Sequence, residues 1–265
     1  MEDPAVIRTV FATRYVTPLR EGGSLPAIVE ADDLGYYVLK FRGAGQGVLA
    51  LAAELICAGL GRVLGLPVPE VVFATVDSEL GRNEGDPEIR DLLQSSQGTN
   101  LGMDYLPGSV MFDPAARDPV DPVLAARIVW FDSFITNMDR TARNPNLLCW
   151  HNALYLIDHG AALYFHHDWS EIEARAANRF PLVRHHVLLP WAEDLEAADA
   201  ALRPKLTRSG IEQIVAGVPN EWLVPVPGAE TPQAKRDGYL QYFLKRLETA
   251  PLFVEEALHA RAKLV

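Results

Sequence analysis

A run of polar residues between positions 137 and 158 carries the side chains best suited to chemistry in this sequence. Asp139 lies five residues before Asn144 and nineteen before Asp158, which ends an apolar, strand-like run. Phosphoryl transfer from ATP requires a carboxylate that orients the attacking hydroxyl, and an amide oxygen with a second carboxylate that bind Mg²⁺. Asp-x4-Asn is also the spacing of kinase-like catalytic loops. The sequence therefore predicts a phosphotransferase.

Two charged residues stand out in otherwise apolar segments of the first half. Lys40 lies in the strand-like run 36–41, and Glu54 lies in the apolar stretch 47–66. A buried charge is costly unless an opposite charge compensates it. We therefore predict that Lys40 and Glu54 pair, because kinases use a strand lysine oriented by a helix glutamate to bind ATP phosphates.

Arg140 and Asn146 flank the predicted catalytic group. Arg140 directly follows Asp139, so we expect its guanidinium to bind either phosphate or an acidic neighbour that orders the loop. Asn146 is a second amide close to the predicted metal site. The five-residue step from Asp139 is the kinase step, and it favours Asn144 over Asn146 as the ligand.

Two glycine-rich segments are candidates for a phosphate-binding turn. Gly22-Gly23-Ser24 precedes the Lys40 strand, as the glycine-rich loop of a kinase does, although a glycine pair between strands is also typical of a plain hairpin. The segment 43–47 follows the Lys40 strand and invites a dinucleotide-binding interpretation. That motif is G-x-G-x-x-G, and Val48 stands where its third glycine belongs, so Gly22, Gly23 and Ser24 are preferred.

Composition and charge restrict the class of protein. The 265 residues are 49% hydrophobic and 22% charged, which is typical of a globular enzyme. A net charge of −11 argues against broad nucleic-acid binding, although a few local cations and Mg²⁺ still permit a phosphate-bearing ligand. Cys57 and Cys149 lie among apolar residues, which predicts buried thiols of an intracellular, cytoplasmic protein. Glu54 and Arg62 make 47–66 a core helix rather than a membrane span.

The hydrophobic pattern changes from strand-like to helical near residue 100, which predicts an α+β, bilobal protein-kinase-like fold with lobes 1–100 and 101–265. We expect adenine to pack on a connector at 101–106, which includes Met103 and Tyr105. The expected strands are 5–16, 26–42, 71–76, 99–106 and a hairpin of 146–150 with 153–158. The expected helices are 48–64, 122–137, 189–201, 207–217 and 232–262, and 77–97 is an exposed polar insertion.

At these residues the chain resembles the HipA-like kinase family, and its catalytic loop is similar to that of phosphatidylinositol 3- and 4-kinases. The resemblance rests on Asn-x-Asp-Arg-Thr…Asn-x-Asn-Leu-Leu, on Asp158, and more softly on segments 66–70 and 219–222. It implies ATP with Mg²⁺, Asp139 as catalytic base, Asn144 and Asp158 as metal ligands, and Lys40 as the phosphate-binding lysine. His159 departs from the pattern, since protein kinases commonly have Phe there.

Two classes of function follow from this set. The first is an active ATP-dependent kinase that phosphorylates a hydroxyl, with a protein Ser or Thr as the preferred acceptor and a small molecule or lipid as the alternative. The second is a pseudokinase or nucleotide-binding module that interacts with partners without turnover. The joint presence of Lys40, Asp139, Asn144 and Asp158 favours the first, because a binding module does not need the base.

Overall fold

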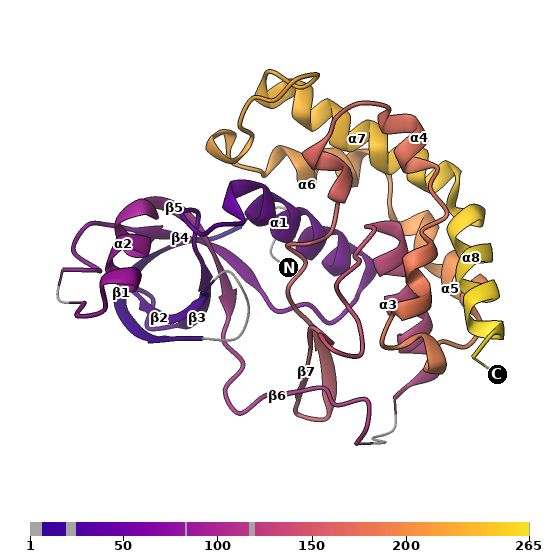
Figure 1. Cartoon of the computed structure of the whole chain (residues 1–265), viewed down its shortest axis with the longest axis horizontal. Coiled ribbons are helices and arrows are strands. Elements are labelled where there is room, and N and C mark those ends of the chain that lie inside the picture. Colours follow the sequence, from indigo (N-terminus) through magenta and orange to yellow (C-terminus); the bar gives the residue numbers. More distant parts are fainter. Residues whose placement is uncertain (1–6, 20–24, 83, 117–119, 265) are drawn as a thin grey trace.

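The computed structural model describes residues 7–19, 25–82, 84–116 and 120–264, so Gly22, Gly23 and Ser24 lie outside the described residues. The first part is rich in strands and the second in helices (Figure 1). The strands are β1 (Thr9–Pro18), β2 (Ala27–Ala31), β3 (Tyr36–Lys40), β4 (Val71–Val76), β5 (Gly98–Asp104), β6 (Val110–Met111), β7 (Leu147–Trp150) and β8 (Ala153–Leu156). The α-helices are α1 (Gly47–Leu64), α2 (Pro87–Ser95), α3 (Pro122–Phe134), α4 (Ile172–Ala176), α5 (Leu195–Leu202), α6 (Arg208–Ala216), α7 (Pro232–Glu248) and α8 (Ala250–Ala262). Short 3-10 helices lie at η1 (Tyr164–His167), η2 (Pro181–His185), η3 (Leu189–Trp191), η4 (Arg203–Lys205) and η5 (Asn220–Trp222).

The first five strands close into a small barrel in the order β1-β2-β3-β5-β4, the ring at the left of Figure 1. Its interior is filled by side chains of alternating inward positions, many of them small, such as Ala27, Ala31 and Ala74. β3 runs antiparallel to both of its neighbours, and β1 with β4 is the parallel pair. A dinucleotide-binding fold requires a parallel strand before its glycine turn. The dinucleotide interpretation of segment 43–47 is therefore excluded.

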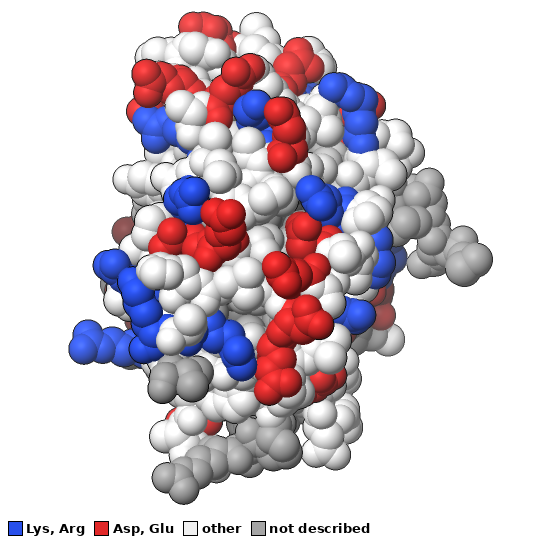
Figure 2. All heavy atoms as spheres, turned by 90° about the vertical axis from the view of Figure 1, so that its right-hand side faces the viewer, with Lys and Arg blue, Asp and Glu red and all other residues white. Residues whose placement is uncertain are grey.

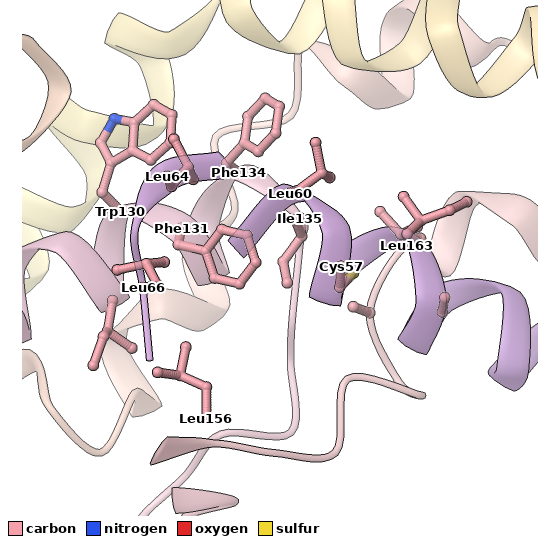
Figure 3. Packing of buried hydrophobic residues seen from close by; sticks show 14 of the residues in the cluster. Cys57, Leu60, Leu64, Leu66, Trp130, Phe131, Phe134, Ile135, Leu156 and Leu163 are labelled. Carbon is pink, nitrogen blue, oxygen red and sulfur yellow. The ribbon is translucent and has the colours of Figure 1, made fainter. Parts of the chain in front are cut away.

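Helix α1 belongs to the core of the second half of the chain, although the sequence places it in the first lobe. Its buried residues join those of α3 in the large apolar cluster, whereas the barrel interior forms a separate one. Figure 3 shows side chains of α1 (Cys57, Leu60, Leu64) and of α3 (Phe131, Phe134) filling the same interior. Within the described residues, α1 is the one helix long and apolar enough to cross a membrane, but 61% of it is buried inside the protein. A core helix passes the same test of length and composition.

The hairpin β7–β8 matches its predicted position and carries the catalytic segment on either side. Its turn residues His151 and Asn152 both have positive φ, 47° and 62°, as a two-residue turn of type I′ requires. β6 pairs with the outer edge of β7, so the chain leaving the barrel joins this small sheet. The side-chain N–H of Trp150 donates to the carbonyl of Pro107 at 3.0 Å and fixes the same junction.

Two predicted elements are each divided in the structure. The expected strand 26–42 is a hairpin of β2 and β3, because Leu34 adopts a left-handed φ of 64° and Asp33 accepts from the Gly35 N–H. The expected helix 232–262 is two helices that part at Thr249. Pro251 lacks a backbone N–H, so a helix that runs through it loses one hydrogen bond. The expected helix 189–201 is likewise the short helix η3 followed by α5, which Asp194 caps through the Ala197 N–H.

The surface turned toward the right of Figure 1 is of mixed charge. Figure 2 shows acidic side chains in a broken line down this face, with basic side chains beside them. This pattern agrees with the net charge of −11 and differs from the uniformly basic surface that binds a nucleic-acid backbone.

His166 on η1 is fully buried, and its burial predicts a specific dependence of stability on pH. Burial lowers the pKa of His166 to about 3, with smaller contributions from His167 and Lys235, while Nδ1 hydrogen-bonds the Tyr239 hydroxyl at 2.9 Å. Between about pH 6.5 and 3 the unfolded chain therefore binds one more proton here than the native protein. Stability falls with decreasing pH in that window by about 1.4 kcal/mol per pH unit.

We expect His166→Gln to remove this slope. Urea unfolding of wild type and variant at several pH values measures it, and the difference at pH 8 reports the packing lost by the substitution alone. Parallel curves between pH 6.5 and 4 would show that His166 does not titrate in this way.

Candidate active site

Lys40 brings together two acidic side chains that the sequence places far apart. Its ammonium group bonds Glu54 Oε1 of α1 and lies 2.6 Å from Asp158 Oδ1, which follows β8. The predicted pair of Lys40 and Glu54 is thus present. Asp158 is added as a second partner, so the barrel, α1 and the segment after β8 meet at one ammonium group.

The charges in this cluster are mutually stabilised. Burial by itself would lower the pKa of Lys40, but the attraction of Glu54 and Asp158 outweighs it and places the pKa above its ordinary value. For Glu54, burial would raise the pKa, and the Lys40 charge with a contact from His159 instead places it well below its ordinary value. Both groups are therefore ionised at neutral pH, as a phosphate-binding lysine requires.

His159 extends the cluster to the far side of Glu54. Its Nδ1 lies 3.7 Å from Glu54 Oε2, and its ring packs edge-on against Phe131 with centroids 5.9 Å apart. The buried Nε2 has no hydrogen-bond partner among the described residues. The histidine that replaces the usual Phe thus keeps the aromatic packing and adds a polar contact to Glu54.

The loop around Asp139 is ordered by three asparagines. Asn144 and Asn146 donate from Nδ2 to Asp139 Oδ2 at 2.9 and 3.4 Å, and Asn137 Oδ1 accepts from the Asp139 N–H at 3.2 Å. The carboxylate of Asp139 is therefore oriented before any ligand binds. Since both amides donate to Asp139 through nitrogen, their oxygens face elsewhere and are the atoms suited to a cation.

Arg140 corrects one prediction, because it does not face a ligand. It is 1% exposed, its Nε donates to Asp132 Oδ2 at 2.5 Å, and it also donates to the backbone carbonyl of Asn146. Of the two roles that the sequence allowed, the structure matches the one in which Arg140 binds an acidic neighbour and orders the loop. Arg140 is therefore not one of the groups that contact substrate.

Asp132, near the end of α3, is the acidic neighbour and was not predicted from the sequence. It accepts from Asn137 Nδ2 at 3.0 Å and contacts His186 Nε2 at 2.8 Å. Because His186 Nδ1 accepts from the Leu188 N–H, Nε2 carries the proton and donates to Asp132. The available signal was an isolated charge in an apolar helix just before Asp139, the same kind of signal that identified Glu54.

Asp158 has the exposure and geometry that a metal ligand needs. Its side chain is 47% exposed, and its φ of 57° lies in the left-handed region that Asp tolerates better than most residues. The Ile157 N–H donates to the carbonyl of Asn146 at 3.1 Å, which connects the Asp158 segment directly to the Asp139 loop. Within the described residues, no group of three or more His, Cys, Asp or Glu side chains could bind a metal. One carboxylate with one amide fits Mg²⁺, which usually takes its other ligands from phosphates and water.

The predicted adenine-binding residues lie where β5 leaves the barrel. Met103 pairs with Val38 of β3 and is 9% exposed, and the Tyr105 N–H donates to the carbonyl of Tyr36 at 3.0 Å. The chain then runs through β6 to the sheet of β7 and β8 (Figure 1). The segment is thus a connector between barrel and helical part, and its contact with adenine stays a prediction.

Comparison with known proteins identifies the family. The model of the HipA-like kinase family matches residues 13–254, which is most of the chain. The chain belongs to the HipA-like kinase family. A kinase-type phosphotransferase activity follows from this membership, which confirms the coarser part of the sequence-based prediction.

A solved structure supports the fold of this HipA-like kinase. The Helicobacter pylori proinflammatory kinase CtkA is similar over 97% of this chain and 99% of its own, with a TM-score of 0.55 and 12% sequence identity. At that identity the likeness establishes a kinase fold alone. No curated protein matches the chain.

Proposed function

We propose that the protein transfers the γ-phosphate of ATP, in the presence of Mg²⁺, to a hydroxyl group, with a protein Ser or Thr side chain as the preferred acceptor. The observation that carries this proposal is the position of the Lys40 ammonium between Glu54 and Asp158, with Asp158 joined to the Asp139 loop through the Ile157–Asn146 hydrogen bond. These are the groups that bind phosphate, metal and acceptor hydroxyl in phosphoryl transfer.

Each residue contributes a distinct step. Lys40, oriented by Glu54, binds phosphate oxygens and exchanges part of its contact with Asp158 for them. Asp158 and the amide oxygen of Asn144 would bind Mg²⁺, which when present supplies positive charge against the transferring phosphate. Asp139 accepts a hydrogen bond from the acceptor hydroxyl, aims the oxygen at phosphorus and receives its proton as the bond forms.

Arg140 and Asp132 support this step from beneath the loop. They fix the backbone on both sides of Asp139 through the Asn146 carbonyl and the Asn137 amide. Gly22, Gly23 and Ser24 are proposed to cover the phosphates, and Met103 and Tyr105 to contact adenine.

The alternative of a nucleotide-binding module without turnover is less well supported. Such a module requires Lys40 and Asp158, but it gains nothing from a carboxylate oriented by two amides at Asp139. A small-molecule or lipid acceptor remains the second alternative within the kinase class.

Two substitutions test the nucleotide site directly. Asp158→Asn removes charge from the predicted metal site, so the Mg²⁺-dependent thermal shift with ATP should shrink from the roughly 2.7 kcal/mol expected at 100 times the Kd. Lys40→Ala should lower the rate of transfer from γ-labelled ATP and weaken ATP binding, because the phosphates lose their cation. Asp91→Asn on α2, an exposed carboxylate far from the site, is the control and should behave as wild type. A wild-type protein without a Mg²⁺-ATP shift and without transfer would refute the proposal.

A further inference from the structure

The segment 219–222, Pro-Asn-Glu-Trp, has a place in the structure that the catalytic groups do not explain. It includes η5 and lies between α6 and α7 of the helical part, yet two of its side chains contact the barrel. Glu221 Oε2 lies 2.5 Å from the guanidinium of Arg42, and Trp222 Nε1 donates to the carbonyl of Thr99 at 3.2 Å. We call this segment, residues 219–222, the strap.

The strap contacts both strands that determine where Lys40 lies. Arg42 comes two residues after Lys40, beyond the end of β3, and Thr99 comes two residues before Leu101, the partner of Lys40 on β5. Buried Asn100 joins these strand ends, since its Oδ1 accepts from the Arg42 N–H at 2.8 Å. The strap therefore acts on a connected pair of strand ends.

A row of side chains links the strap to the active site across the barrel surface. Phe73, Leu101 and Lys40 are register partners on the neighbouring strands β4, β5 and β3, so their side chains point to the same face. Trp222 is fully buried and packs edge-on against Phe73 at one end, with ring centroids 5.8 Å apart. Lys40 meets Glu54 and Asp158 at the other end.

The backbone is built to admit the Arg42 contact. Gly98 has a φ of +100°, and a Cβ atom there would lie 2.9 Å from the guanidinium nitrogen that faces Glu221. Glycine at this position therefore leaves space for Arg42 to reach the strap.

The strap is itself anchored to the helical part. Arg236 of α7 donates to Asn220 Oδ1 and to the Val218 carbonyl, both at 2.7 Å. The preceding helix α6 approaches α1 so closely that a Cβ at Gly59 would lie 2.9 Å from Ile214. The helix that carries Glu54 and the strap that contacts the barrel thus share one rigid support.

We propose that Glu221 and Trp222 are positioning residues for phosphoryl transfer, which fix the barrel on the helical part so that Lys40 stays aligned with Glu54 and Asp158. This inference rests on the proposed function. All of these contacts are formed without a ligand, so the Lys40–Glu54 pair does not wait for a swing of α1.

Reversal of one charge tests the inference with little disturbance of the fold. In Glu221→Arg a second cation faces Arg42 and separates the strap from the barrel. We expect kcat for turnover of Mg²⁺-ATP to fall about tenfold or more, because a displacement of about 1 Å at a reacting group can cost about 100-fold. The KM for ATP should change less than kcat, and the melting temperature should hardly change, since the ion pair is partly exposed, at 23% and 41% of the two side chains.

The double variant Arg42→Glu/Glu221→Arg restores the attraction with the charges exchanged and should recover kcat to within about threefold of wild type. Trp222→Phe keeps an aromatic ring against Phe73 and removes only the donor to Thr99, so it should lower kcat in the same direction by a smaller factor. Glu212→Arg makes the same charge reversal in an exposed ion pair of α6 and is the control expected to match wild type.

The outcomes separate this inference from the proposed function. A wild type that transfers phosphate, with Glu221→Arg equal to it, overturns the inference alone. An exchanged pair as impaired as the single variant likewise overturns the inference and leaves the proposed function standing. No turnover by the wild type overturns the proposed function and the inference with it.

Discussion

Asp139→Asn should reduce phosphoryl transfer by about 10²–10⁴-fold while nucleotide binding largely survives. Asparagine has the shape of aspartate and keeps one oxygen to accept from Asn144 and Asn146, so the loop should stay ordered. What it loses is the negative charge that attracts and deprotonates the acceptor hydroxyl. Single-turnover transfer from γ-labelled ATP measures the loss, and the thermal shift with Mg²⁺-ATP measures the binding that remains.

The contrast with Asp158→Asn makes this prediction specific. Asp139→Asn should keep the Mg²⁺-dependent shift and lose transfer, whereas Asp158→Asn should lose part of the shift itself. If the two variants showed the opposite behaviour, the roles of the carboxylates would be reversed. Equal transfer rates for Asp139→Asn and wild type would exclude Asp139 as the base.

Asp132→Asn should destabilise the protein by about 3–5 kcal/mol, because it leaves the buried Arg140 without its counter-charge. The ion pair of Asp132 and Arg140 is fully buried on both sides. Urea unfolding at pH 7 measures the free energy. The comparison is Asp168→Asn, which breaks the partly exposed pair with Arg175 and should cost less than about 1 kcal/mol.

The destabilisation by Asp132→Asn should also depend on pH. Burial would raise the pKa of Asp132, but Arg140 and the hydrogen bond from His186 hold it well below its ordinary value. A carboxylate with a lowered native pKa stabilises the fold above the pKa of the unfolded chain, about 3.9, and loses that contribution as the pH falls through the native value. The free-energy gap between wild type and Asp132→Asn should therefore shrink below about pH 4. A gap that stayed constant down to pH 3 would show that the charge of Asp132 is not the source of the effect.

Local sequence signals predicted the elements whose physics is local. The boundaries of α1 and β4 followed from an apolar run ended by Pro67 and from a β-branched run, and the hairpin β7–β8 followed from its two-residue turn. The pair of Lys40 and Glu54 was predictable for a related reason. Each is an isolated charge in an apolar segment, and an isolated buried charge requires a partner.

Errors arose where one residue interrupts a continuing pattern. The turn at Leu34 and the break before Pro251 both divide a segment whose hydrophobic period continues on either side. Periodicity describes which face is buried and carries little information on where the chain bends.

The tertiary structure alone decided three matters at the site. Whether Arg140 turns toward a ligand or toward Asp132 depends on α3 lying beneath the loop, and sequence spacing contains no such distance. The assignment of α1 to the helical core depends on which apolar surfaces meet, because apolar packing is not directional. The contact of Glu221 with Arg42 joins residues 179 positions apart, and only the folded chain brings them together. Thus the identities and spacing of the catalytic groups are written locally in the sequence, whereas their orientation comes from long-range packing.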